Sequence, residues 1–588
     1  MAVINRASTS MIPPKADPVS APHLSLVFRS CQTAFLSAAL FSCVINILML
    51  SGPIFMLQVY DRVLASRSVP TLIALAILVG ILFVFLGLFD LLRARILARI
   101  ARRIDQRIHA ALFGAVIDHS VRRTLNLRAQ PLRDLDTLRQ FLAGPSPATL
   151  FDLPWTPIYI AIIFLLHVDL GIFALAGAAL LAALAAVNDR LTRVPLARSG
   201  EGAMLSHRIA EECRRNAAVI QAMGMLPEAQ ARWQAAHDKA LSDHLRASDR
   251  NGAFSALAKC LRLVLQSAIL ALGAYLVILQ DITAGTIIAS SILMSRALAP
   301  IEQGISHWRG FLNVLNAVRR LGLVLADSRQ QRPKMALPAP KGRLGVEGLS
   351  IAAPGEATPI LRGIGFALQP GQALGVIGPS GAGKSTLARA LANVWAPASG
   401  VISMDGAPFP QWDAATLGRH IGYLPQDVDL FEGTFEENIA RFQRDAKPEN
   451  VIRAARLTGV HDLILQFPDG YKTHIGEAGI KLSVGQRQRI GLARALYGDP
   501  ALIILDEPNA SLDAAGENAL SRAIAAATKR GATVIVVSHR PSVLSYIDLV
   551  LLLNGGRQIA FGPKREVLKN VVIGPAPGAY QPREALHG

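Results

Sequence analysis

The chain has 588 residues, a formal net charge of +18 and a hydrophobic content of 51%. Its length is too great for a single hydrophobic core, and its mean hydropathy of +0.36 is high for a soluble protein. The positive charge alone is compatible with nucleic-acid binding, but the basic residues cluster beside apolar segments, as they do at the cytoplasmic flanks of membrane helices. No recognised nucleic-acid-binding motif is present. The composition therefore predicts a membrane-embedded part and no nucleic-acid partner.

The N-terminal residues 1–30 are polar and contain prolines, without an apolar core beside a small-residue cleavage site. They predict a cytoplasmic tail and not a signal peptide. The four cysteines have neither metal-ligand spacing nor a disulfide-rich density, and the sequence assigns them no role. They are Cys31, Cys43, Cys213 and Cys260.

Six apolar runs predict six membrane spans, because a hydrocarbon core of about 30 Å is crossed by roughly 20 helical residues. Residues 58–64 form a brief polar excursion after the first run. Beyond Asp90, arginines alternate with apolar residues at helical spacing, so the second helix is predicted to continue into the cytoplasm. The arginine-rich connections place both termini on the cytoplasmic side. The predicted spans are 33–57, 70–89, 153–166, 170–187, 261–279 and 283–299.

Arg296 lies within the sixth predicted span. A charge in hydrocarbon is costly and is often functional. We expect instead that this arginine snorkels, or faces the wall of an aqueous cavity without contacting a substrate.

The composition changes after the last span. Residues 327–342 are polar and contain prolines, which predicts a linker. From residue 343 short apolar strands alternate with amphipathic helices, a pattern typical of an α/β domain. The predicted order is an N-terminal tail, a six-span domain, a linker, an α/β domain and a C-terminal tail, over residues 1–30, 31–326, 327–342, 343–570 and 571–588.

A glycine-rich loop stands between an apolar run at 373–377 and a helical run at 387–391. Its glycines allow backbone conformations in which successive N–H groups point at phosphate oxygens, assisted by the positive end of the following helix. Lys384 would add a charge for the β and γ phosphates, and Ser385 a hydroxyl for Mg²⁺. The pattern predicts nucleotide binding by Gly378, Pro379, Ser380, Gly381, Ala382, Gly383, Lys384, Ser385 and Thr386.

Two acids end the apolar run at 502–505. The carboxyl ends of buried parallel strands meet at the crevice where such folds bind ligands. Asp506 is therefore predicted to hold Mg²⁺ through water, and Glu507 to polarise the attacking water.

Five further positions are candidates. Ser483 can cap the helix that follows it, and the amide of Gly485 can approach a phosphate closely. Gln426 follows a short strand, and His539 ends a later one, from which it can reach the γ-phosphate region. Gln426, His539 and Asp513 would each, taken singly, be as readily an ordinary cap or loop residue, but their order and spacing disfavour that interpretation.

In this order the motifs resemble those of the ATP-binding cassette family. The loop at 378–386 is similar to its Walker A motif and the strand with its two acids to Walker B. Gln426 is similar to the Q-loop glutamine, and residues 482–486 are similar to the signature sequence. Residues 511–513 are similar to the D-loop, and His539 to the switch histidine. The resemblance implies a membrane α-helical bundle of six spans with long cytoplasmic helices, fused to an α/β P-loop nucleotide-binding domain.

The resemblance also implies a homodimeric ATPase in which ATP lies between Lys384 of one subunit and Ser483 of the other. Val484 departs from the family, whose signature usually has glycine there. The implied catalytic residues are Glu507, His539 and Gln426. The implied Mg²⁺ ligands are Ser385, Gln426 and Asp506, and the nucleotide contacts beyond the loop are Ser483, Gly485, Gln486 and Asp513.

Weaker matches in the membrane half resemble the ATPase/permease of bacterial type I secretion systems, in particular those that export metalloproteases. These matches are residues 56–64, 133–136, 151–155 and 216–226. They imply a protein of the bacterial inner membrane, with a periplasmic adaptor (membrane fusion protein), an outer-membrane channel and an unfolded secreted polypeptide as partners. The segments 132–144 and 216–226 would couple the membrane domain to the cassettes.

Two other functions stay open. The same motor could export a lipid, a glycan or a small molecule, or the cassette could gate a channel or regulator passively. Glu507 disfavours the passive function, because a regulatory cassette could dispense with a catalytic base, and fusion of spans and cassette in one chain disfavours an importer. The sequence identifies no cargo, and leaves open whether Arg296 or residues 1–30 contact it.

One feature of the cassette departs from the family. Its members usually stack adenine on an aromatic residue before the first cassette turn, but here residues 352–355 are Ala-Ala-Pro-Gly and no aromatic residue occurs between Phe311 and Phe366. Base stacking contributes roughly 1–3 kcal/mol in comparable sites. We therefore expect weaker nucleotide affinity and poor discrimination among purine nucleotides.

Overall fold

The computed structural model describes residues 24–122, 131–327, 337–356, 358–476, 479–510, 512–538 and 546–571. The chain forms two compact units, one within residues 1–330 and one mostly within residues 331–588. Parts of the predicted tails and linker lie outside the described residues, namely 1–23, 328–336 and 572–588.

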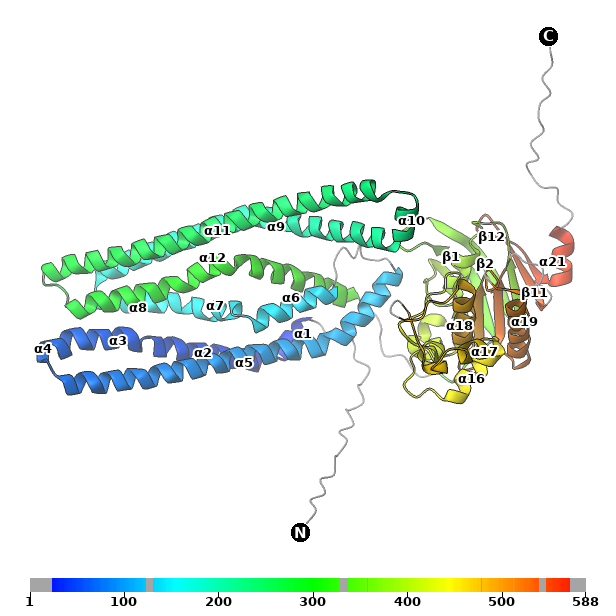
Figure 1. The fold of residues 1–588 in the computed structure, drawn as a ribbon, viewed down its shortest axis with the longest axis horizontal. Coiled ribbons are helices and arrows are strands. Elements are labelled where there is room, and N and C mark those ends of the chain that lie inside the picture. The colour runs from blue at the N-terminus through cyan, green and yellow to red at the C-terminus, as the bar shows by residue number, and fades with distance from the viewer. Residues whose placement is uncertain are drawn as a thin grey trace, which may run out of the picture. The chain divides into compact units, whose positions relative to one another are not determined.

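The first unit is a bundle of long helices (Figure 1). In the described part of the chain six helical segments are long and apolar enough to cross a membrane, which confirms the six predicted spans. Its elements are α1 (Leu24–Arg29), α2 (Gln32–Met49), α3 (Ser51–Gln58), η1 (Val59–Val63), α4 (Leu64–Ser66), α5 (Val69–Arg122), α6 (Pro131–Ala143), α7 (Ser146–Asp152), η2 (Leu153–Trp155), α8 (Thr156–Leu166), α9 (Val168–Arg215), α10 (Ala217–Ala222), α11 (Leu226–Ile278) and α12 (Ala284–Asp327).

Helix α5 has two different halves. Its N-terminal half exposes large apolar side chains such as Ile77, Ile81 and Val84, as a helix surrounded by lipid does. Its C-terminal half buries Ile100, Ile104 and other residues at intervals of three and four, one face of a helix. The continuous helix of 54 residues confirms that the second span extends well beyond its apolar run.

The first span is longer than predicted, because the polar residues 58–64 remain helical. They form a π-helical turn, η1, and the helix ends only near Arg67, which has a left-handed φ of 51°. Asp61 explains why the chain stays folded here. Its carboxylate accepts hydrogen bonds from the Thr283 hydroxyl at 2.7 Å and from the Gly285 amide at 2.9 Å, at the start of α12.

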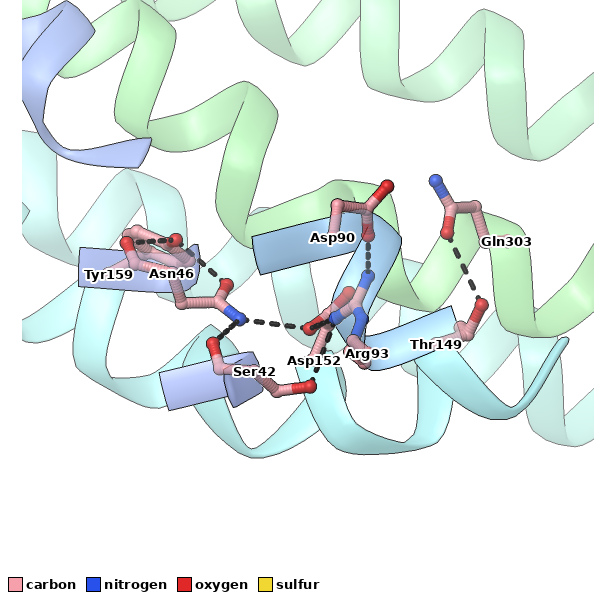
Figure 2. Close-up of polar contacts among 8 residues, drawn as sticks. All are labelled: Ser42, Asn46, Asp90, Arg93, Thr149, Asp152, Tyr159 and Gln303. Atoms are coloured by element: carbon pink, nitrogen blue, oxygen red, sulfur yellow. Dashed lines mark hydrogen bonds and ion pairs between the residues drawn. The ribbon is translucent and has the colours of Figure 1, made fainter. Parts of the chain in front are cut away.

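A buried arginine joins three helices of this unit (Figure 2). The guanidinium of Arg93 on α5 donates to the Ser42 hydroxyl on α2 and to the Asp152 carboxylate at the end of α7, both at 3.0 Å. It also donates to Asp90, one turn earlier on α5, at 2.7 Å. Arg93 is 7% exposed, so these acceptors replace the water that its charge would otherwise need.

The same network continues into α8 (Figure 2). The Asn46 side-chain amide donates to Asp152 at 2.9 Å, and the Tyr159 hydroxyl donates to the side-chain oxygen of Asn46 at 2.9 Å. Tyr159 is 1% exposed within an apolar cluster with residues of α9, α11 and α12. Polar contacts and apolar packing therefore hold α2 and α8 together.

The second unit is built on a six-stranded sheet with the order β12-β11-β3-β10-β9-β6, in which only β12 runs antiparallel to its neighbour. A four-stranded antiparallel sheet has the order β2-β1-β4-β5. The strands of the two sheets are β1 (Leu344–Ala352), β2 (Pro359–Leu368), β3 (Ala373–Ile377), β4 (Ser399–Met404), β5 (Ala407–Pro408), β6 (Ile421–Leu424), β9 (Leu502–Asp506), β10 (Thr533–Val537), β11 (Leu549–Asn554) and β12 (Arg557–Pro563).

Alternate residues of the central strands pack on opposite faces of the larger sheet. Leu502 and Ile504 of β9 join a core with α13 (Lys384–Leu391) and the antiparallel sheet. Ile503 and Leu505 join a second core with α18 (Val484–Leu496) and α19 (Ala514–Lys529). Burial on both faces explains why these strands are continuous apolar runs, and it fixes their carboxyl ends in a row.

A smaller helical part carries its own core. Phe435, Ile439 and Val451 are buried there with Ile490 of α18. Its helices are α15 (Phe435–Ile439), α16 (Pro448–Leu457) and α17 (His461–Leu465). Arg441 ties this part to the sheet, because its guanidinium donates to the carbonyl of Ile421 in β6 at 3.1 Å and to carbonyls of α18. Burial lowers the pKa of Arg441 to about 10.

Candidate functional site

The phosphate loop leaves β3 after Ile377 and enters α13 at Lys384, as predicted. Gly378, Gly381 and Gly383 have φ angles of 154°, 79° and 91°, which other residues rarely adopt. A Cβ on Gly383 would lie 2.5 Å from a methyl carbon of Leu361. Glycine is therefore required here for both backbone conformation and space.

Lys384 lies inside this loop and is 6% exposed. Its ammonium donates to the carbonyls of Gly378 at 2.9 Å and Pro379 at 2.8 Å. Burial lowers the pKa of Lys384, and the nearby carboxylates of Glu507 and Asp506 act in the opposite direction. A buried cation at the N-terminus of a helix is suited to an anionic ligand such as a phosphate.

Asp506 ends strand β9 and is 1% exposed. It accepts a hydrogen bond from the Ser385 hydroxyl at 3.2 Å. Burial raises the pKa of Asp506, while the bond from Ser385 opposes that rise. The predicted pair of Ser385 and Asp506 is therefore brought together, with oxygen ligands of the kind that hard cations prefer.

Glu507 follows with a φ of 49°, a left-handed value that is strained for a residue other than glycine. Its backbone amide donates to Val537 at the end of β10 at 2.9 Å. Its carboxylate accepts a hydrogen bond of 2.9 Å from the side-chain amide of Gln426. The backbone therefore turns Glu507 toward Gln426, beyond the carboxyl ends of the neighbouring strands β9 and β6.

Two residues that the sequence did not single out support these positions. Gln488 of α18 donates to the backbone carbonyl of Glu507 at 3.1 Å and is 4% exposed. Arg489 contacts the carboxylate of Asp513 at 3.2 Å. The sequence did hold a sign of the role of Gln488, because this polar residue shares a helical face with Leu492 and Ala495, which are buried.

The signature segment forms the start of α18. The Ser483 hydroxyl accepts from the Gln486 amide at 3.2 Å, and the Gln486 side chain accepts from the Ser483 amide at 2.9 Å, a capping box. This confirms Ser483 as a helix cap, and Val484 beside it is exposed. Among the described residues no hydrogen bond joins Ser483 or Gln486 to the phosphate loop.

The remaining predicted site residues are placed only in part. Asp513 caps α19 by accepting from the Gly516 amide at 2.9 Å. Gly485 lies in the first turn of α18. Ser511 and His539 lie outside the described residues, so their predicted roles stay predictions.

Residues 361–510 match the ABC transporter family, and residues 35–300 match the ABC transporter transmembrane region. The chain is 46% identical over 562 residues to the type I secretion system ATP-binding protein PrsD of Rhizobium meliloti (strain 1021). The aligned region covers 95% of each of the two chains. It is 29% identical to the leukotoxin translocation ATP-binding protein LktB of Mannheimia haemolytica, over 91% of this chain and 76% of LktB.

The fold is similar to that of a bacterial Atm1-family ABC exporter with ATP bound. The TM-score is 0.79 at 21% identity, over 92% of this chain and 96% of the exporter. At this identity the likeness concerns the fold alone. The family matches, the sequence relatives and the phosphate site together show that the chain belongs to the ABC transporter family. It is a multi-pass inner-membrane ATPase of the type I secretion kind, which drives polypeptide export.

Proposed function

We propose that two copies of this chain form the motor and permease of a type I secretion system, with ATP bound between Lys384 of one copy and Ser483 of the other. The observation that carries the proposal is the division of the ATP-binding motifs. Lys384, Ser385 and Asp506 lie together, whereas Ser483 caps α18 and makes no hydrogen bond to the phosphate loop within the described part of the chain. A second copy would supply the missing half of each site.

Ser385, Asp506 and Gln426 are the proposed Mg²⁺ ligands. The hydroxyl and carboxylate oxygens of Ser385 and Asp506 already lie within hydrogen-bond distance of each other, at 3.2 Å. When bound, Mg²⁺ would neutralise phosphate charge during phosphoryl transfer. Its own charge would also favour the ionised form of Asp506, whose pKa burial raises.

Glu507 is the proposed base that orients and polarises the attacking water. The bond from Gln426 fixes one carboxylate oxygen of Glu507, and the bond from Gln488 to its carbonyl fixes the backbone. His539 is assigned to the γ phosphate from the family resemblance. Phosphoryl transfer depends on in-line placement and neutralised charge more than on covalent chemistry, so this positioning is what the protein has to supply.

Segments 132–144 and 216–226 are the proposed coupling elements. The first contains most of α6, which is joined to α12 by a two-pronged ion pair between Asp134 and Arg320 at 2.8 and 2.6 Å. The second contains the short helix α10, between the long helices α9 and α11. Motion of the cassettes would pass through these contacts into the spans.

The proposed partners are those that the resemblance to type I secretion systems implies, and the similarity to a protein named for such a system supports them. They are a periplasmic adaptor, an outer-membrane channel and an unfolded polypeptide with a C-terminal signal, with both termini of this chain in the cytoplasm. ATP binding would close the cassettes and open the membrane domain outward, and hydrolysis would reset it.

ATP hydrolysis by the purified full chain in nanodiscs tests this function. The wild type is compared with Glu507→Gln and with Glu449→Gln, which makes the same change at an exposed position on α16. Each is assayed with and without a C-terminal fragment of a secreted protein. We expect activity in the wild type and in Glu449→Gln, a change in that activity on adding the fragment, and almost none in Glu507→Gln.

Other outcomes would point elsewhere. Activity that ignores the fragment but responds to lipids or small molecules would keep the motor and overturn the polypeptide cargo. Absence of hydrolysis in the wild type would favour a passive, nucleotide-gated channel or regulator.

A further inference from the structure

Helix α12 differs from the other spans in what it exposes. The other five spanning segments all expose large hydrophobic side chains, for example Ile81 and Val84 on α5 or Leu175 on α9. Between residues 285 and 314 of α12 no large hydrophobic side chain is exposed. A helix face in contact with lipid tails is apolar, so the part of this face within about 30 Å of Ala284, at membrane depth, does not face lipid.

The residues that α12 does expose form one stripe. Within 285–314 they are spaced by seven, three, four and three positions, which places them along a single side of a helix. All are polar, charged or glycine. They are Arg296, Gln303, Ser306, Gly310 and Asn313, called here the α12 polar stripe.

Arg296 is the charged member of the stripe. It lies about 18 Å along the helix from Ala284, near the middle of a hydrocarbon core of about 30 Å. Its guanidinium has no hydrogen bond or ion pair among the described residues, whereas Arg262 nearby in the unit is paired with Glu302. Snorkelling would require the side chain to span about 15 Å to either surface, which is beyond its reach.

The backbone carbonyl of Arg296 also lacks its usual helical hydrogen bond, at the same membrane depth as the guanidinium. Pro300 lies inside α12, one turn after Arg296. Proline has no N–H, so the carbonyl of Arg296 loses its helical hydrogen-bond donor. A guanidinium without an ion pair and a carbonyl without its helical donor, at the same depth, both favour water or a polar ligand.

We propose that the α12 polar stripe lines the path of the exported polypeptide, and that Arg296 binds carboxylate groups of the polypeptide in transit. The inference rests on the polypeptide-export function proposed above. A guanidinium offers a planar fork of donors that matches a carboxylate. The site therefore favours acidic segments over basic ones.

Gln303 complements this site two helical turns away. Its side-chain oxygen accepts from the Thr149 hydroxyl at 3.3 Å (Figure 2), which fixes the amide. Its amide nitrogen has no partner among the described residues and can donate to a backbone carbonyl of an extended chain. The exported chain would thus meet a charge-selective contact at Arg296 and then a contact at Gln303 that does not depend on the sequence of the exported chain.

A second copy of α12 is the competing occupant, because small and polar stripes also pack helices together in membranes. The stripe contains no aspartate or glutamate. Packing of the stripe against its own copy would supply no counterion for Arg296, and near the two-fold axis it would bring two like charges together. The charge of Arg296 therefore favours the polypeptide.

The first test compares two synthetic peptides of equal length, one Gly/Ser chain with regularly spaced glutamates and one with lysines in their place. The measured quantity is the peptide concentration that half-maximally changes ATP hydrolysis by the full chain in nanodiscs. We expect the wild type to prefer the acidic peptide by about tenfold, the size of one charge-assisted contact. Arg296→Lys should keep that preference, Arg296→Gln should abolish it and Arg296→Glu should reverse it.

Arg246→Gln is the matched control, because Arg246 is an exposed arginine on α11 away from the stripe, and it should behave as the wild type does. A reversed preference is a result that a merely structural role of Arg296 would not produce. If the wild type responds to the C-terminal fragment but to neither peptide, only this inference is wrong. If it hydrolyses ATP but responds to neither the fragment nor the peptides, polypeptide export fails as well. If peptides act but their ranking is the same in Arg296→Glu, only the inference about Arg296 is wrong.

The second test locates the side chain. A cysteine is placed at Arg296 or at Val84 in a chain whose four native cysteines are replaced by serine. We expect a membrane-impermeant thiol reagent to label the cysteine at 296 and not the one at 84, which lies on the apolar face of α5. A photo-crosslinker on this Arg296→Cys variant should then capture either peptide, because the guanidinium that selects the acidic one is gone. Absence of labelling, or crosslinks only between two copies of the chain, would overturn the proposal.

Discussion

The side-chain amide of Gln426 donates a hydrogen bond of 2.9 Å to the carboxylate of Glu507. The two residues are 81 positions apart in the sequence and follow neighbouring parallel strands, β6 and β9. The contact links Glu507, the residue expected to activate water, with Gln426, one of the residues expected to bind Mg²⁺. The hydrogen bond therefore fixes the orientation of the Glu507 carboxylate, the proposed base of the site.

Gln426→Ala is expected to lower kcat for ATP hydrolysis by about 10- to 100-fold, because the Glu507 carboxylate loses the bond that orients it. The Kd for ATP should change much less. Gln426→Glu should lower kcat at least as far, since it replaces a donor with a like charge. Steady-state hydrolysis and equilibrium nucleotide binding measure both quantities. Gln443→Ala, at an exposed loop position, is the control, and equal effects of the two alanine variants would contradict this role.

Gly383→Ala is expected to raise the Kd for ATP at least tenfold. The new Cβ would meet Leu361 at 2.5 Å in a backbone conformation with a φ of 91°, so the loop would have to shift away from its phosphate-binding shape. Gly531→Ala is the matched control, because its φ is 97° but no heavy atom of a described residue beyond its chain neighbours lies within 4 Å of the added Cβ. It should cost roughly 1 kcal/mol of stability without changing the Kd, and a similar loss of affinity in both variants would argue against a local clash.

Arg93→Met is expected to destabilise the membrane unit by about 3 kcal/mol or more, because Asp152 then stays largely buried without its cation. The double variant Arg93→Met with Asp152→Leu should recover much of that loss, since no uncompensated charge remains. Thermal unfolding in detergent measures the change. Arg246→Met removes a long ion pair of 3.8 Å between an exposed arginine and Asp243 and should cost less than about 1 kcal/mol. An additive double variant would show that the two residues are not coupled.

The cassette lacks the aromatic residue that would stack on adenine, and we expect similar KM values for ATP and GTP. Ala353→Tyr should add stacking and lower the KM for ATP, by the equivalent of about 1–3 kcal/mol. Ala353→Leu adds volume without an aromatic face and should not produce that gain. Hydrolysis rates over a range of each nucleotide provide the comparison. A strong ATP preference in the wild type would count against the expectation.

Much of the fold could be predicted because its signals are local. The runs at 373–377, 502–505 and 533–537 became strands β3, β9 and β10, since continuous apolar residues indicate strands buried on both faces. The glycine pattern and Lys384 also predicted the phosphate loop, because the conformation of such a loop depends on residues adjacent in the sequence. The six spans followed from hydropathy and length.

The parts that could not be predicted depend on contacts between distant segments. The first span continues through residues 58–64 because Asp61 is satisfied by the start of α12, which the polar sequence alone does not reveal. Gln488 was missed because its partner is a backbone carbonyl at Glu507. Arg296 was noticed as a charge, but the stripe to which it belongs depends on which sides of α12 the other helices cover.

Each ATP is proposed to lie between Lys384 of one copy and Ser483 of the other, and dimers that combine two variants test this arrangement. Lys384→Ala and Ser483→Ala are combined in two ways, either one in each copy or both in a single copy beside a wild-type partner, with different tags to isolate each mixed dimer. The quantity measured is vanadate-trapped nucleotide per dimer.

If the two residues act across the interface, the dimer with one substitution in each copy keeps one intact site and traps nucleotide, whereas the dimer with both in one copy keeps none. We expect that result. The reverse pattern, with trapping only when both substitutions share a copy, would mean that each chain binds ATP with its own Lys384 and Ser483, and would rule out ATP sites shared between two copies.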